Sequence, residues 1–345
     1  MSNKPLIHLF IPQLFQPLSV WKQGFQFEPN CTYLIKILQN FQKVRTSEVI
    51  GISASLFSSL GLAEGCELPA AYYRFKSQQF DHSHLINHSL LCADPVHLEI
   101  GMSDITLTDK SIDLSANEAS ELMTLLNEYF NQDGLNFMLD SNKKGYLSFA
   151  GNEEVDSSPL ENVFRKNITN FLIKSKGRNW QALQNEVQML LHSAPLNQQR
   201  EMAGLPTVNS LWLWGGGDPE VFSQKASHVF SDNKSRGEMI AQASECKYQP
   251  LSHLTDVSDT EFVEGKTIII SEVLDSLALN NDIEHYQKEL NRLDNDLFKP
   301  LLQLWQWDKI DILIDSCDGK TIKPLPSSAW KFWKKSPASL TDLGL

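Results

Sequence analysis

One segment, residues 185–217, constrains the fold most because it joins a helix, a turn, a strand and a glycine loop without interruption. Apolar residues at helical spacing end at Pro195, and the apolar run Ser210–Trp214 predicts a buried strand. Three glycines follow at 215–217, and glycine backbone can approach an anion closely and direct N–H groups at it. Two interpretations stay open: an anion-binding loop that opens a helix at Asp218, or a tight turn that holds no ligand.

Strands alternate with helices along much of the chain, which indicates an α/β fold. The helical pattern from Asn281 to Trp305 is long enough to connect two parallel strands. We therefore predict a mostly parallel sheet flanked by helices, with functional residues in the loops that follow the carboxyl ends of its strands. The apolar runs that predict these strands are Leu6–Ile11, Ser210–Trp214, Thr267–Ser271 and Ile310–Asp315.

A smaller α+β domain interrupts this pattern at residues 89–175. Its sequence predicts a hairpin, a helix and two further strands, an order unlike the alternation around it. Ser115 and Glu118 have the spacing of a capping box at the start of the helix. We therefore expect a discontinuous core, residues 1–88 and 176–345, with one inserted domain.

Composition limits the partners of the chain. The formal net charge is −12 over 345 residues, whereas a protein that binds nucleic-acid phosphates needs a local excess of Lys and Arg. The five cysteines are scattered without a CxxC pair, and no apolar run approaches the length of a membrane span. We expect a cytoplasmic protein that binds neither nucleic acid nor membrane.

The run HSAPLNQQREMAGLPTVNSLWLWGGG, residues 192–217, resembles a motif of the archaeal-type cofactor-independent phosphoglycerate mutases. In that family a stretch close to HPVNxxRxxxGxxPAN precedes a strand and a glycine-rich loop. The order of elements in the smaller domain is similar too, and a group of bacterial proteins known as regulatory proteins of the RpfE type is closer still. The residues that fall on the motif are His192, Pro195, Asn197, Arg200, Gly204, Pro206 and Asn209.

The resemblance implies an alkaline-phosphatase-like sheet, two divalent metals and a serine that carries the phosphoryl group. This chain departs from that pattern at the metal-binding positions. No carboxylate follows the strand Leu6–Ile11 before Glu28, and no histidine closely follows the strands that end near Ser271 and Asp315. We therefore expect no cofactor. The serines in the region of the family's nucleophile also lack a neighbouring aspartate; they are Ser47, Ser53 and Ser55.

The first hypothesis is a divergent, non-catalytic relative of these mutases that retains an anion pocket and has a regulatory or binding role. Its ligand would be a small phosphorylated or carboxylate compound. Arg200 could bind such an anion in a bidentate manner, or could pair with Glu186 or Glu201 inside the protein. Asparagine also commonly caps turns, and a histidine at a helix end also interacts with the helix dipole. The residues expected to line the pocket are His192, Asn197, Arg200, Asn209, Gly215, Gly216 and Gly217.

Two other hypotheses stay open. The chain could be an active phosphomutase or phosphatase with a serine nucleophile and a rearranged Mg²⁺ or Mn²⁺ site, because hard cations bind to oxygen ligands alone. The weak candidate ligands are Asp315 and Asp318, with Glu272 and Asp275. Alternatively, aromatic side chains near the C-terminus would mark a protein partner surface if they are exposed, or fill a core if they are not. They are Trp305, Trp307, Trp330 and Trp333.

Overall fold

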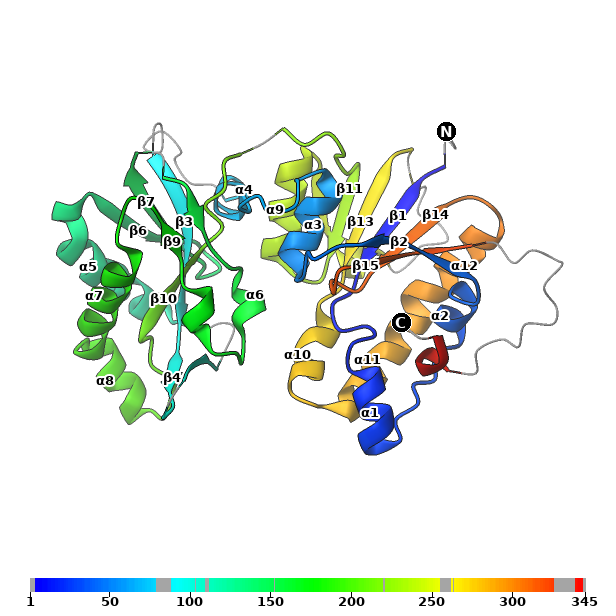
Figure 1. Ribbon diagram of the computed structural model, residues 1–345, viewed down its shortest axis with the longest axis horizontal. Helices are drawn as coiled ribbons and strands as arrows, with labels where there is room; N and C mark the ends of the chain where they lie inside the picture. Colours follow the sequence, from blue (N-terminus) through cyan, green and yellow to red (C-terminus); the bar gives the residue numbers. More distant parts are fainter. Residues whose placement is uncertain are drawn as a thin grey trace. The chain divides into compact units, whose positions relative to one another are not determined.

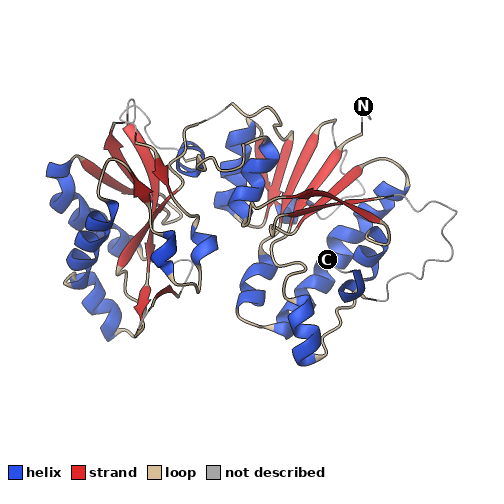
Figure 2. Cartoon of the chain, viewed as in Figure 1, coloured by secondary structure: helices blue, strands red, loops and turns tan. Residues whose placement is uncertain are grey.

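The fold is described from a computed structural model of the chain (Figure 1). The described residues are 4–78, 88–102, 104–108, 112–151, 153–219, 221–254, 262, 264–325 and 339–343. The chain divides into two compact units, the first comprising residues 1–64 and 222–345 and the second residues 65–221. Both units combine helices with strands (Figure 2).

The first unit is built on a seven-stranded sheet. Its strands are β1 (Leu6–Phe10), β2 (Phe41–Thr46), β11 (His228–Ser231), β12 (Lys247–Pro250), β13 (Lys266–Ile270), β14 (Asp311–Asp315) and β15 (Lys320–Pro324). They lie in the order β12-β11-β13-β1-β14-β15-β2. The first five in this order are parallel, and β15 is antiparallel to both of its neighbours. The predicted α/β fold with a mostly parallel sheet flanked by helices is therefore confirmed.

Helices cover both faces of this sheet. They are α1 (Leu18–Phe25), α2 (Thr32–Ile37), α3 (Ile52–Leu60), α9 (Lys234–Ser244), α10 (Val273–Leu279), α11 (Ile283–Leu293) and α12 (Lys299–Gln306), with short turns η4 (Leu251–Leu254), η5 (Asp294–Phe298) and η6 (Leu340–Leu343). Ile7 and Leu9 of β1 pack with α1, α2, α11 and α12 in one apolar core. On the other face α3 contacts β1 and α9 contacts β11 (Figure 1). The predicted long helix is present as α11, the π-helical turn η5 and α12 in succession.

The second unit contains a four-stranded antiparallel sheet. Its strands are β3 (His88–Val96), β6 (Leu135–Leu139), β7 (Gly145–Ala150) and β10 (Ser210–Trp214), in the order β10-β3-β7-β6. The prediction that Ser210–Trp214 belongs to the parallel sheet is therefore wrong. Every residue of β10 is buried, so its sequence has the continuous apolar character of a parallel strand although its pairing is antiparallel.

The remaining elements of the second unit cover this sheet or extend from it. The helices are α4 (Ala70–Lys76), α5 (Ala116–Phe130), α6 (Leu160–Val163), α7 (Trp180–His192) and α8 (Pro195–Met202), with turns η2 (Asn131–Asp133) and η3 (Ile168–Phe171). Two small ribbons are formed by β4 (Leu98–Ile100) with β5 (Ile105–Leu107), and by β8 (Val155–Asp156) with β9 (Lys174–Ser175). The predicted capping box is confirmed, because Ser115 and Glu118 exchange both hydrogen bonds at the start of α5.

The unit boundaries differ from the predicted ones. Residues 65–88 and 176–221, which we assigned to the core, lie in the second unit. The reason is packing. Helix α4, in the first of these segments, contacts β3, and α7, in the second, contacts β10, so both helices pack against the antiparallel sheet. No helix begins at Asp218 in the described part of the loop, where residues 215–219 have no regular structure. Among the described residues, none of the helices has the length and apolar character that crossing a membrane requires.

Candidate functional site

Asn197 and Asn209 use their side-chain amides to complete backbone hydrogen bonding in the second unit. The Asn209 amide accepts from the Leu98 N–H at 2.7 Å and donates to the Leu98 carbonyl at 2.8 Å. The Asn197 amide does the same for Val208, at 2.8 Å in both directions, and donates a further bond to the carbonyl of Leu191. Each amide therefore acts as a peptide group would in a neighbouring strand.

Arg200 is buried, and its guanidinium donates to three acceptors within the second unit. Its Nε donates to the Pro206 carbonyl at 2.6 Å, and its Nη1 donates to the Asp113 carbonyl at 3.2 Å. The same Nη1 forms an ion pair with Glu118 Oε1 at 2.6 Å, with side-chain exposures of 4% for Arg200 and 21% for Glu118. The partner is therefore neither Glu186 nor Glu201, the two carboxylates considered from the sequence.

The glycine loop binds an anion that belongs to the chain itself. The carboxylate of Glu67 accepts hydrogen bonds from the N–H groups of Gly215 at 3.2 Å and Ser157 at 3.0 Å, from the Ser157 hydroxyl, and from the Gly216 N–H. Burial raises the pKa of Glu67, and these hydrogen bonds oppose that shift only in part. The loop thus forms a nest of backbone donors, as the glycines suggested, with an internal carboxylate in it.

Close packing explains why three glycines stand in a row. Gly215 has φ +74°, in the left-handed region that glycine favours. A Cβ on Gly216 would overlap the side chain of Leu91, and a Cβ on Gly217 would overlap the carbonyl of Glu67. The Gly217 N–H also donates to the Leu68 carbonyl at 2.9 Å. The loop is therefore both a tight turn and an anion nest.

The predicted pocket residues do not converge on one point. Asn209 immediately precedes β10 and the glycine loop immediately follows it, so a five-residue strand of roughly 17 Å separates them. His192 is exposed at the C-terminal end of α7. A separate pocket of about 410 Å³ lies beside the glycine loop, where Gly216 and Gly217 line it together with Tyr72 and His88.

A second candidate site lies at the carboxyl ends of the first unit's parallel strands. β11 and β13 are neighbours, yet the chain leaves β11 through α9 toward β12 and leaves β13 through α10, α11 and α12 toward β14. Right-handed crossovers in opposite directions place their helices on opposite faces of the sheet. The place between two neighbouring strands whose connections run to opposite faces is called a switch point. Open α/β sheets usually bind their ligands at the carboxyl ends of the strands at this point.

Charged and hydroxyl side chains occupy this switch point. Arg236, in the first turn of α9, forms an ion pair with Glu272 at 2.7 Å and donates a hydrogen bond to the hydroxyl of Ser53 in the first turn of α3. Asp232, directly after β11, accepts from the Ser271 hydroxyl at 2.9 Å and from the Glu272 N–H at 3.0 Å. Together with Asp315, which ends β14, these side chains form what we call the carboxyl-edge cluster. It consists of Ser53, Asp232, Arg236, Glu272 and Asp315.

The end of β14 adds a buried carboxylate and a buried thiol. Asp315 accepts from the Cys317 N–H at 2.8 Å and from the Thr321 hydroxyl at 2.9 Å. Burial raises the pKa of Cys317, the nearby charge of Asp315 raises it further, and the guanidinium of Arg236 opposes the shift. The Cys317 thiol is therefore protonated and unsuited to nucleophilic attack. Arg236 lies within electrostatic range of the end of β14.

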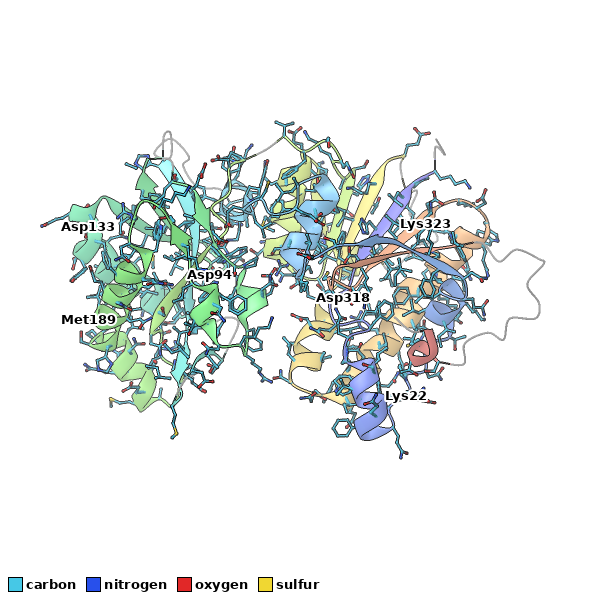
Figure 3. All side chains as sticks on the ribbon, viewed as in Figure 1. Lys22, Asp94, Asp133, Met189, Asp318 and Lys323 are labelled. Atoms are coloured by element: carbon cyan, nitrogen blue, oxygen red, sulfur yellow. The ribbon has the colours of Figure 1, made fainter. Side chains whose placement is uncertain are left out.

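The donor set at this edge does not fit the two divalent metals that the family resemblance implies. The carboxylates of Asp232, Glu272 and Asp315 each accept hydrogen bonds from protein donors, and Asp318 pairs with Lys320 at 3.3 Å. Figure 3 marks Asp318 in the first unit. Among the described residues, no group of three or more His, Cys, Asp or Glu side chains is placed to hold a metal ion.

Arg236 and Asp232 are the residues that sequence reasoning missed. The strand that presents them, β11, has four residues, which is too few for a periodic pattern to be recognised. A signal was present, because the short apolar run Val229–Phe230 is followed by Asn233, whose side chain caps α9 by accepting from the Arg236 N–H.

A buried ion pair in the second unit was missed as well. Arg74 and Asp94 are 5% and 4% exposed and pair at 3.0 Å. Asp94 is labelled in Figure 3. Trp214 Nε1 also donates to Asp94 at 2.8 Å, and the guanidinium lies 4.7 Å from the ring centre of Tyr146. Burial alone would raise the pKa of Asp94, but Arg74 and the hydrogen bonds outweigh it and the pKa is lowered. The pair ties α4 to β3.

The C-terminal aromatic residues are divided between core and surface. Trp305 is partly buried against the core of the first unit, whereas Trp307 is 63% exposed. Trp330 and Trp333 lie outside the described residues. A contiguous aromatic partner surface therefore remains an expectation from the sequence.

Comparison with known proteins identifies similar structures but no family. No protein-family model matches the sequence, and no curated protein sequence matches it. The PH0037 protein from Pyrococcus horikoshii aligns with a TM-score of 0.53 at 11% identity, over 93% of this chain and 86% of that one. A cofactor-independent phosphoglycerate mutase from Thermoplasma acidophilum DSM 1728 aligns with a TM-score of 0.43 at 14% identity, over 93% and 89%. At 11% identity, the likeness to PH0037 is one of fold alone.

Proposed function

We propose that this chain is a non-catalytic relative of the cofactor-independent phosphoglycerate mutases, akin to the regulatory proteins of the RpfE type, that binds a small anionic ligand without a metal. The family assignment rests on the sequence motif at residues 192–217 and on the α/β fold with an inserted unit. The observation that carries the non-catalytic role is the ion pair between Arg236 and Glu272 at the sheet's switch point.

Charge and hydrogen bonding at the carboxyl-edge cluster support this role. A mutase of this family needs a cation pair that stabilises the attacking and leaving oxygens of the transferred phosphoryl group. Arg236 supplies one positive charge, and its guanidinium group is bound to Glu272 and Ser53. Asp232 and Asp315 accept from Ser271, Cys317 and Thr321 rather than standing ready as ligands.

The pocket of about 410 Å³ beside the glycine loop is the candidate ligand site. The loop carries backbone N–H groups of the kind that bind anions, and the carboxylate of Glu67 accepts hydrogen bonds from them. The polar side chains that line the pocket include those of His88, Ser89 and Asp218, so an anionic ligand would have to bind on the side of His88 and Ser89, away from the Asp218 carboxylate. A small phosphorylated or carboxylate compound matches this chemistry.

One observation favours the second candidate, an active phosphomutase or phosphatase. Ser53 lies in the first turn of α3, and its hydroxyl is hydrogen-bonded to Arg236. A serine at a helix N-terminus beside a guanidinium is an arrangement that could accept a phosphoryl group. Against this, Ser53 is 0% exposed in the first unit.

An activity assay separates the two candidates. Purified protein is incubated with 3-phosphoglycerate and, separately, with p-nitrophenyl phosphate, in EDTA, Mg²⁺ and Mn²⁺. The proposal expects no isomerisation or hydrolysis above the rate of the Ser53→Ala variant in any of these buffers. Metal-dependent turnover that Ser53→Ala abolishes would establish the enzyme instead.

A further inference from the structure

The carboxyl-edge cluster gathers negative charge around one positive group. Asp232 and Glu272 follow neighbouring strands, and the Glu272 N–H donates to the Asp232 carboxylate at 3.0 Å. Asp315 ends β14, and Cys317 beside it is within electrostatic range of both Arg236 and Glu272. Carboxylates that gather at one edge of a sheet destabilise one another unless a cation lies among them.

Arg236 is placed to be that cation. Its side chain is 14% exposed and that of Glu272 is 17% exposed, so the pair is not a solvated surface contact. The guanidinium reaches across the switch point, from α9 to Glu272 after β13 and to Ser53 in α3. A planar fork with several N–H donors can satisfy a carboxylate and a hydroxyl together, which a lysine amine cannot do with the same geometry.

We infer that Arg236 is the resident cation of the carboxyl-edge cluster and occupies the place that a divalent metal would otherwise take among these oxygens. The inference rests on the proposed metal-independent role, and it names Arg236 as the residue that makes the site independent of metal. A bound metal would have to displace the guanidinium from Glu272 and Ser53, and it would also be repelled by the fixed positive charge.

Removal of the guanidinium should therefore create a metal site. The Arg236→Ala variant would leave Glu272 and Asp232 with the Ser53 hydroxyl, a set of hard oxygen ligands that suits Mg²⁺ or Mn²⁺. The test is thermal unfolding of the full chain in EDTA, 1 mM Mg²⁺ and 1 mM Mn²⁺. We expect Mn²⁺ to raise the Tm of Arg236→Ala by at least about 3 °C and to leave wild type within about 1 °C, because a ligand stabilises only the state that binds it.

Matched variants identify the residue responsible. Arg292→Ala removes an arginine of the same unit from an exposed pair with Glu289, and it should gain no metal response. Arg236→Lys keeps the charge and should also gain none. The double variant Arg236→Ala with Glu272→Gln should lose the gain. If Arg236→Ala does not fold, the neutral Arg236→Gln replaces it in the same test.

The outcomes separate the two claims. If folded Arg236→Ala and Arg236→Gln show no metal response while wild type is also unresponsive, the inference about Arg236 is overturned and the proposed metal-independent role stands. A metal-induced rise in the Tm of wild type would overturn both. A response in the arginine-free variants that the double variant lacks supports both claims.

Discussion

Arg200 is joined to Glu118 by an ion pair of 2.6 Å that ties α8 to the first turn of α5. The other carboxylate oxygen of Glu118 accepts from the Ser115 N–H at 2.7 Å and so completes the capping box. Burial tends to raise the pKa of Glu118, but the hydrogen bonds from Ser115 and Arg200 outweigh it and the pKa is lowered. One carboxylate therefore links two helices and caps one of them.

Replacement of Arg200 should destabilise the second unit. Arg200→Ala removes the partner of Glu118 and leaves the Pro206 carbonyl without its donor, so we expect a loss of roughly 3 kcal/mol in the free energy of unfolding. Urea denaturation followed by tryptophan fluorescence measures it. Arg292→Ala, which breaks an exposed pair, should cost less than about 1 kcal/mol. A fully stable Arg200→Ala protein would contradict the structural role.

Asn209 is expected to matter through its two backbone hydrogen bonds. Asn209→Ala would leave the N–H and carbonyl of Leu98 without these partners and should cost about 2 kcal/mol. Asn185→Ala in α7, an exposed position, is the control and should change stability by less than about 0.5 kcal/mol. Equal stability of the two variants, measured by urea denaturation, would show that the amide of Asn209 is dispensable.

The glycine loop should depend on Glu67. Glu67→Ala would leave the Ser157 N–H without its acceptor and the Gly215 N–H with the Ser157 hydroxyl, 2.9 Å away, as its remaining acceptor. It should cost about 2 kcal/mol, whereas Glu67→Gln keeps an acceptor oxygen and should cost less. Amide hydrogen exchange of the two donors reports the effect directly, with faster exchange expected in Glu67→Ala. Glu128→Ala, an exposed change in the same unit, serves as control. Unchanged exchange would argue against the nest.

Lys266 should give the first unit a distinctive pH dependence. Burial lowers the pKa of Lys266 from 10.5 to about 8, although its Nζ donates to the Ser59 carbonyl at 2.6 Å. Between these values the native state holds fewer protons than the unfolded state, so stability should rise as pH rises from about 8 to 10.5, by about 3 kcal/mol at most.

The Lys266→Met variant tests that pH dependence. It should remove this rise from the pH profile of the free energy of unfolding, while Lys288→Met, an exposed change in α11, should keep it. Comparison of the two profiles cancels contributions from other groups. Profiles with the same slope in both variants would exclude Lys266 as the source.

The sequence predicted fold class better than it predicted the site. Long periodic segments such as the helix over Asn281–Trp305 were recognisable because amphipathic helices repeat their pattern over several turns. β10 was assigned to the wrong sheet because its pairing depends on β3, which lies far from it along the chain. Burial of both faces makes parallel and antiparallel strands alike in sequence.

The candidate site was harder to predict, for a physical reason. The motif around Asn197 and Arg200 has side chains that could bind an anion, but the same amide and guanidinium groups serve equally well to satisfy buried backbone carbonyls. Only the fold decides between the two uses. The carboxyl-edge cluster depends in turn on Arg236 and Ser53, which are 183 positions apart and meet only when the sheet forms.

Metal content of the wild-type protein tests the central claim most directly. The protein is dialysed to equilibrium against Mn²⁺, with and without 3-phosphoglycerate. The bound metal per chain is then measured by inductively coupled plasma mass spectrometry. A metal-independent binding protein should retain well below one Mn²⁺ per chain under both conditions. Binding of about two Mn²⁺ per chain, the number that in-line phosphoryl transfer between paired metals requires, would contradict the account.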